Sequence, residues 1–412
     1  MGHIKTLLVI IFCFSISYAY NSLNITANWS LNFYKKIISP LQGQNICNFS
    51  PTCSQFYKQS INKHGIVIGS MMGADRLMRC NPWAWAFLDK YYFGVDNNRL
   101  LDLPENHYVS QVMSLRPDSG KQSHITNEGD YHVHFAWTRN DTLAKPTTNN
   151  QQPTTTLAFA DYLFQSQDYT RAIGEYKRLL FFYPDTQDNI KEYIQLMLGE
   201  SYLMVKDCQQ ALSYFSLQDN PYFNYNRARV YFEQGDYPKT RDELNSVLDM
   251  GFDEKQIVLY GMSFYKEHNF SDGARFFQTH APAGFSVINE LCNFDGKEIK
   301  KRNRTTSTLF SVVIPGLGQV YSSRFGDGLY SFLTVVGCGS LAYYYWEHDN
   351  SKVKFSIFSL LTALFWSGNV YGANIAARDY NEFQIKQYLM KIDNVVRELD
   401  LTPNYDKLKM KN

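Results

Sequence analysis

Three cysteines and one histidine near the N-terminal end of the chain could do chemistry together: Cys47, Cys53, His64 and Cys80. Cysteine thiolates and histidine nitrogens are the ligands that zinc prefers. However, the first two cysteines are farther apart in sequence than the ligand pairs of the usual zinc motifs. In an oxidising compartment, two of the thiols would instead form a disulfide and leave one free. The favoured interpretation is simpler: small side chains that pack a helical core.

The same four residues are also the candidates for catalysis. A Cys–His hydrolase needs a third group that orients the histidine, and no such group can be identified in the sequence. The chain also lacks a phosphate-binding glycine loop, a His-Glu-x-x-His pair and a Gly-x-Ser-x-Gly elbow. We therefore expect no catalytic residues and no cofactor.

The elements that position these residues are predicted to be helical. Residues 54–63 and residues 66–78 each have the pattern of a helix, and His64-Gly65 between them has the sequence of a C-terminal stop. His64 is therefore expected at a helix end, near the helix dipole, rather than in the position of a catalytic base.

The segment around the cysteines is strongly basic. The whole chain has a net charge of +1, but residues 29–82 contain six bases and one acid, Asp75. Residues 29–41 place apolar side chains on one helical face beside two lysines, as in an interfacial amphipathic helix or an ordinary core-packing helix. The charge favours an anionic membrane surface, with a solvated face as the alternative, and no nucleic-acid-binding motif is present. The bases expected to contact lipid or a partner are Lys35, Lys36, Lys58, Lys63, Arg76 and Arg79.

Four short blocks occur in order within residues 34–82. They are Tyr-x-x-x-Ile-Ser-Pro-Leu at 34–41, Pro-Thr-Cys-Ser at 51–54, His64-Gly65, and Arg-Cys-x-Pro at 79–82. This order resembles the YidD family of membrane protein insertion efficiency factors, small basic proteins associated with the bacterial inner membrane. The resemblance implies a non-enzymatic role in membrane-protein insertion, with the insertion machinery or its client proteins as partners. An older interpretation of the family as haemolysins leaves a lipid-active enzyme as an alternative.

The resemblance ends at about residue 82. Family members usually have Arg-Cys-His-Pro followed by a glycine-rich tail, whereas this chain has Asn81 in place of the histidine and Trp-Ala-Trp-Ala-Phe at residues 83–87. A role that depends on that histidine or that tail is therefore not carried over to this chain.

Residues 1–19 have the pattern of a secretory signal peptide. Lys5 precedes an apolar stretch at residues 7–16, and Ser-Tyr-Ala at residues 17–19 offers a cleavage site. The stretch is shorter than the roughly 20 residues that span a membrane, so cleavage is favoured over anchoring. This predicts export of the soluble domains and a disulfide among the clustered cysteines. The basic residues 300–304 argue for the cytoplasm instead, because positive charges flanking membrane helices favour that side.

Residues 157–285 contain a repeated pattern. Its anchors are Tyr169, Cys208, Tyr237 and Phe270, at intervals of 39, 29 and 33 residues. The pattern resembles tetratricopeptide repeats, which stack helix pairs and bind proteins in a concave groove. We expect an unidentified protein partner in that groove, with a purely structural spacer as the alternative.

Residues 305–380 have the composition of a membrane domain. Two apolar stretches, at about 328–346 and 353–377, are joined by a short polar loop, which predicts a hairpin of two transmembrane helices. The segment 307–321 is too short to span, so we expect it to enter the membrane partway or to lie on it. A buried soluble hairpin is the alternative.

The complete prediction is a mostly α protein of several domains. These are a signal peptide (1–19), a YidD-like basic three-cysteine module (29–95), a largely disordered linker (110–156), tetratricopeptide-like repeats (157–285), the membrane domain (305–380) and a partly helical tail (381–412). Such a protein would be integral to the bacterial inner membrane and would assist the insertion or assembly of membrane proteins. The alternatives are a repeat-based envelope scaffold without an insertion role and the lipid-active enzyme.

Overall fold

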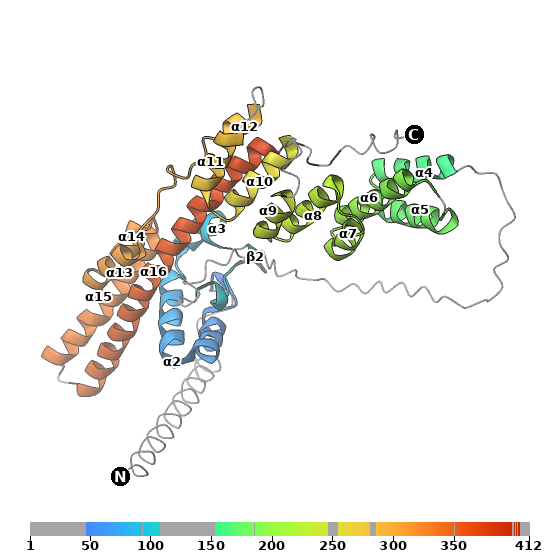
Figure 1. Ribbon diagram of the computed structural model, residues 1–412. Coiled ribbons are helices and arrows are strands. Elements are labelled where there is room, and N and C mark those ends of the chain that lie inside the picture. Colours follow the sequence, from blue (N-terminus) through green and yellow to red (C-terminus); the bar gives the residue numbers. More distant parts are fainter. Residues whose placement is uncertain are drawn as a thin grey trace, which may run out of the picture. The chain divides into compact units, whose positions relative to one another are not determined.

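The computed structural model describes most of the chain. The described residues are 47–92, 94–107, 153–184, 186–245, 254–280, 286–349, 351–397, 399, 401 and 403. The predicted signal peptide, the predicted amphipathic helix with Lys35 and Lys36, and almost all of the predicted linker lie outside them. The described residues are mostly helical with one small sheet, so the prediction of a mostly α protein is confirmed (Figure 1).

The chain folds as two compact units. The first consists of Met1–Ser114 and Ile299–Tyr388, and the second of Leu115–Glu298 and Leu389–Asn412. The three-cysteine segment and the C-terminal apolar helices, which are far apart in sequence, therefore belong to the same unit.

Helix α2 (Cys53–Arg79) contains the turn that the sequence predicts. Gly65 has a φ of 79°, a left-handed conformation that divides the helix into two arms. The arms pack closely, because a Cβ on Gly69 would lie 2.5 Å from the backbone of Ile61. The hydroxyl groups of Tyr57 and Ser70 also lie 3.0 Å apart across the arms. The predicted helix stop at His64-Gly65 is thus confirmed, and it brings the two ends of α2 together.

A small sheet and three short helices complete this part of the first unit. Strand β1 (Phe49–Ser50) pairs in parallel with β3 (Arg99–Leu101), and β2 (Val95–Asp96) pairs antiparallel with β3. The short helices are η3 (Pro82–Phe87), α3 (Leu88–Tyr91) and η4 (Pro104–His107). A buried apolar cluster forms around Phe49 and Leu100, which face each other in the β1–β3 register. We call residues 47–107 the cysteine module.

Four helices form the C-terminal part of the first unit. They are α13 (Arg304–Val313), α14 (Leu317–Tyr321), α15 (Phe325–Glu347) and α16 (Lys352–Val396), the last of which runs on into the second unit. Gly316, with a φ of 86°, separates α13 from α14. Near the loop between α15 and α16, the ring of Trp346 packs 5.0 Å from that of Phe355. We call α13 to α15, and α16 as far as Tyr388, the C-terminal helices.

Helix α16 is apolar enough for a lipid environment. Among the helices that the structure describes, it alone is long and apolar enough to cross a membrane, and only 11% of its most apolar 18-residue window is buried. Large apolar side chains are exposed on α13 as well, where Val313 is 78% exposed, and on α16, where Leu360 is 72% exposed. Exposed apolar surface of this extent is typical of a contact with a membrane or with another protein.

The second unit is built from consecutive helices. They are α4 (Pro153–Gln165), α5 (Tyr169–Phe182), α6 (Asp188–Met204), α7 (Cys208–Phe215), α8 (Pro221–Glu233), α9 (Tyr237–Asn245), α10 (Glu254–Lys266), α11 (Phe270–His280) and α12 (Ser286–Leu291). Small residues let neighbouring helices approach, since a Cβ on Gly199 or Gly261 would overlap the ring of Phe215 or Phe277. Helix pairs thus lie where the repeats are expected, and their tetratricopeptide character stays a prediction.

Candidate functional site

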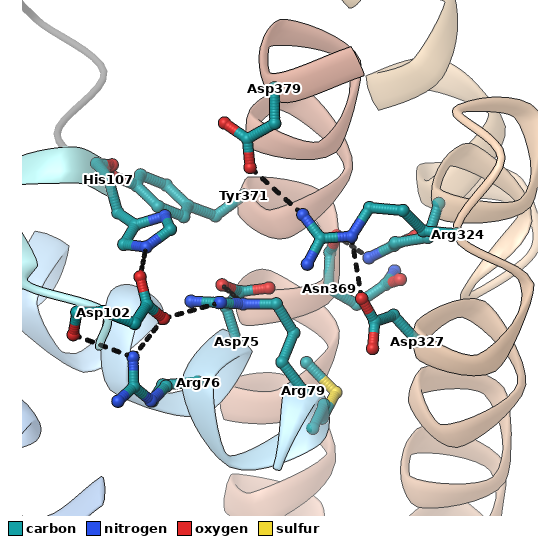
Figure 2. A network of polar contacts seen from close by, with 12 residues as sticks. Asp75, Arg76, Arg79, Asp102, His107, Arg324, Asp327, Asn369, Tyr371 and Asp379 are labelled. Atoms are coloured by element: carbon teal, nitrogen blue, oxygen red, sulfur yellow. Dashed lines mark hydrogen bonds and ion pairs between the residues drawn. The ribbon is translucent and has the colours of Figure 1, made fainter. Parts of the chain in front are cut away.

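A buried network of charges lies at the centre of the cysteine module. The Asp102 carboxylate, just after β3, pairs with Arg76, with Arg79 at 2.9 Å and with the imidazole of His107 (Figure 2). Arg79 also donates from Nε to Asp75 at 2.8 Å. All five side chains are buried, and both arginines come from the second arm of α2. Two carboxylates thus compensate two guanidinium groups away from solvent.

The charges of this network fix its protonation. Burial alone would raise the pKa of Asp102, but its interactions with His107, Arg76 and Arg79 outweigh this effect and hold the pKa well below its usual range. Burial also lowers the pKa of His107, and its partner Asp102 offsets this only in part. We therefore describe Asp102 as ionised and His107 as neutral at pH 7, with the arginines supplying the compensating charge.

A second buried group is centred on Arg324, which precedes α15. Its Nε donates to Asp327 at 2.8 Å, its Nη1 to Asp379 of α16 at 3.1 Å and its Nη2 to the hydroxyl of Tyr92 at 3.2 Å. Arg324 and Asp327 are each 1% exposed. Burial raises the pKa of Tyr92 to about 12, so this hydroxyl stays protonated. Arg324 therefore links two C-terminal helices to the cysteine module.

Further polar contacts join the module to the C-terminal helices. Asn81 donates from Nδ2 to Asp327 at 2.8 Å, and its Oδ1 accepts from the backbone N–H of Trp83 at the start of η3. The hydroxyl of Tyr371 in α16 donates to the backbone carbonyl of His107. The residue that departs from the family pattern, Asn81, is therefore one that contacts α15.

Two glycines of α16 allow close packing against α2. A Cβ on Gly368 would lie 2.6 Å from that of Ala74, and a Cβ on Gly372 would overlap the carboxylate of Asp75. Residues four apart lie on the same face of a helix, and small residues at this spacing let two helices approach closely. Between them, Asn369 accepts from the N–H of Gly316 at 2.7 Å and thus holds the turn between α13 and α14.

The structure separates the predicted basic contacts into three groups. Arg76 and Arg79 are 0% and 4% exposed, so they cannot provide the surface charge that the sequence suggests. They are buried because Asp102 neutralises them, and Asp102 lies outside the basic segment, residues 29–82, from which the surface charge was predicted. Lys58 and Lys63 are exposed, and Lys63 pairs with Glu105. Lys35 and Lys36 lie outside the described residues.

The three cysteines do come together. The Sγ atoms of Cys47 and Cys53 are 3.2 Å apart, those of Cys47 and Cys80 are 3.8 Å apart, and all three cysteines are free. Hydrogen bonds from the thiols of Cys53 and Cys80 lower the pKa of the Cys47 thiol. The contact with Cys47 raises the pKa of the Cys53 thiol. His64, the fourth candidate ligand, does not lie with them: among the described residues, the cluster of possible metal ligands consists of Cys47, Cys53 and Cys80.

Sequence reasoning missed most of the network. Asp102 and His107 follow the family blocks, and Arg324, Asp327 and Asp379 lie in the predicted membrane domain, residues 305–380. A signal was nevertheless present, because ionisable residues beside apolar membrane segments are costly and usually paired.

The cysteine module is similar to known proteins. Residues 23–92 match a family model, YidD, described as "Putative membrane protein insertion efficiency factor". Relatives with that description include one from Moorella thermoacetica, 42% identical over 59 residues, 83% of its length and 14% of this chain. Another, from Thermotoga maritima, is 44% identical over 52 residues, 63% of its length and 13% of this chain. A third, from Lactobacillus johnsonii, is 35% identical over 84 residues, 86% of its length and 20% of this chain.

The match covers one side of the buried network. It includes the three cysteines, both module arginines and Asn81, whereas Asp102, His107 and the C-terminal helices lie outside residues 23–92. Over the matched residues, the relatives are described as insertion factors and not as enzymes. Because this chain covers 83% of the Moorella thermoacetica relative at 42% identity, it belongs to the YidD family through this N-terminal region.

Proposed function

We propose that this protein is a membrane-anchored insertion factor whose YidD-type module is held at the bilayer by its own C-terminal helices. The observation that carries the proposal is the buried network between the module and α15 and α16. Buried charges and hydrogen bonds require specific partners, so this packing is selective in a way that apolar contact alone is not.

The position of the contact along α16 favours a module at the membrane surface. Phe355 begins the apolar part of α16, and Gly372 lies about 25 Å further along at 1.5 Å per residue. The hydrocarbon core of a bilayer is about 30 Å thick. The module would therefore contact α16 near the membrane boundary opposite the α15–α16 loop.

Helix α16 would cross the membrane, and the less apolar α15 would pair with it as the second helix of a hairpin. Their loop end carries Tyr343, Tyr344 and Trp346, which are 51–65% exposed and suit the headgroup region. The exposed Lys58 and Lys63, together with Lys35 and Lys36, would supply the electrostatic contact to anionic lipid, about 1 kcal/mol per base near the surface.

The repeats would bind a protein partner. A cavity of about 280 Å³ in the second unit supports this, because both charged and neutral polar groups line it, including Asn224, Arg227 and Glu243. Such a lining suits a polar peptide segment more than a lipid chain.

Two matched glycine variants test the anchoring of the module. Gly372→Leu would force α2 away from α16, whereas a Cβ on Gly337 of α15 would meet no atom within 4 Å, which makes Gly337→Leu the control. In cells that lack the chromosomal copy, we expect Gly337→Leu to restore protease-protected insertion of a tagged inner-membrane reporter and Gly372→Leu to fail. Both variants should remain in the membrane fraction.

A deletion separates this function from that of a scaffold. If a chain without residues 29–82 supports reporter insertion as well as the full chain does, the insertion role is wrong and a repeat-based scaffold is favoured. The side of the membrane is tested by labelling Ser119→Cys in intact cells with an impermeant maleimide. Export predicts labelling before lysis that exceeds the labelling of the unsubstituted chain.

A further inference from the structure

The three cysteines have the spacing of ligands around one ion. Their sulfur atoms all lie within 4.8 Å of one another, with two separations of 3.2 and 3.8 Å. In a tetrahedral zinc site with Zn–S bonds of about 2.3 Å, ligand sulfurs are about 3.8 Å apart. The observed separations bracket this value, so small side-chain rotations would complete three of the four positions.

The backbone around the sulfurs favours negative charge. Cys53 is the first residue of α2, where the helix dipole stabilises a thiolate. Its backbone N–H donates to the sulfur of Cys47 at 3.3 Å. Backbone donors to a ligand sulfur offset the negative charge that remains when three thiolates bind one divalent ion.

The fold fixes all three ligands in place. Cys47 precedes β1, and Cys53 and Cys80 lie at opposite ends of α2, which the turn at Gly65 brings together. The cysteines pack against the apolar cluster around Phe49 on one side, yet each remains partly exposed. An ion could therefore enter without opening the module.

We propose that Cys47, Cys53 and Cys80 bind a zinc ion, with the fourth position taken by water or by a ligand from outside this group. An all-sulfur donor set selects soft or borderline ions and disfavours magnesium and calcium. The ion would tie the segment before β1 to both ends of α2 and so hold the two arms of this helix together. The inference does not depend on the proposed insertion role.

The first test is the metal content of the full chain, purified in detergent under reducing conditions and reconstituted with zinc. We expect one zinc ion per chain by mass spectrometry of the elements, and its loss in Cys80→Ser. Cys208→Ser and Cys292→Ser are matched controls, because both cysteines are free and lie in the second unit. Cobalt in place of zinc should give thiolate-to-metal charge-transfer absorption that also disappears in Cys80→Ser.

The second test uses the unsubstituted chain, so a folding defect of a variant cannot obscure the result. Zinc should slow the alkylation of Cys47, Cys53 and Cys80 by iodoacetamide and leave that of Cys208 and Cys292 unchanged, as read from peptide masses. Equal alkylation with and without zinc would overturn the proposal. So would zinc retention that does not change in Cys80→Ser, or a disulfide between two of the three cysteines in protein isolated under native conditions.

Discussion

Two kinds of buried contact can be compared in this protein, one from the interior of each unit. In the second unit, glycines admit aromatic rings from the following helix, as Gly199 admits Phe215. In the first unit, charged and amide groups far apart in sequence meet in the interior, as Asn81 and Asp327 do across 246 residues. Apolar packing between successive helices tolerates variation, whereas a buried charge needs its particular partner. Substitutions that break the buried polar network of the first unit are therefore expected to cost more than substitutions at these glycines.

The largest effect is expected where a buried cation is removed. Arg324→Met would leave Asp327 with a neutral donor, Asn81, while Asp379 would keep Arg378. Breaking a buried ion pair in this way costs about 3–5 kcal/mol of unfolding free energy. Tryptophan fluorescence during thermal unfolding in detergent reports mainly on this unit, because five of the six tryptophans lie in its residue ranges and Trp137 alone lies in those of the second unit.

The control for this substitution lies in the second unit. Arg171 has a 68% exposed side chain and pairs with Asp168 on the surface. If Arg324→Met lowers the unfolding temperature no more than Arg171→Met does, the buried network of the first unit contributes no more to stability than an exposed ion pair.

A smaller effect is expected at the contact between Asn81 and Asp327. Asn81→Asp keeps the acceptor for the N–H of Trp83 but replaces a buried donor by a carboxyl group, and a hydrogen bond to a charged group contributes about 1.5–3 kcal/mol. The double variant Asn81→Asp/Asp327→Asn exchanges the two groups, so that the amide donor is at position 327 and the carboxylate is at position 81. A double-mutant cycle in the same unfolding assay should give a coupling energy of about 0.5–3 kcal/mol. Additive losses would mean that the two side chains do not interact.

Packing in the second unit should respond more weakly. Gly261→Ala places a methyl group against the buried ring of Phe277, and overpacking of this kind costs about 1–3 kcal/mol. Gly174→Ala in α5 meets nothing within 4 Å and should instead gain up to about 1 kcal/mol from helix propensity. Hydrogen exchange of peptides from α10 and α11 should accelerate in the first variant only. Equal exchange in both would show that Gly261 has room for a side chain.

The smallest effect is expected at exposed ion pairs, in either unit. Lys63 pairs with Glu105, and Lys206 pairs with Glu233, with side chains that are 49–76% exposed. Lys63→Gln and Lys206→Gln should each change the unfolding free energy by less than about 1 kcal/mol, and salt should reduce the change further. A large effect of Lys63→Gln alone would show that the first unit depends on surface charge as well.

Local patterns in the sequence predicted local structure well. The glycine after His64 indicated the turn in α2, and the mostly helical composition follows from helix-period patterns. The exposure of Arg76 and Arg79 was predicted wrongly, because counting charges in one segment cannot include a partner that tertiary folding supplies. The contact between Asp327 and Asn81 could not be predicted for the same reason, because tertiary folding brings these two residues together. Each residue also has a partner close in sequence, Arg324 for Asp327 and Trp83 for Asn81, but only the fold brings the two residues together.

The division of the first unit between two distant parts of the chain has a consequence for its synthesis. At about 5–20 residues per second, the 246 residues between Asn81 and Asp327 take roughly 12–50 s to translate. Until then, the module lacks the helices that cover it, and its polar groups at that face have only water or another protein as partners. The contacts that bury Asn81 and Tyr92 therefore form late, after most of the chain has been made.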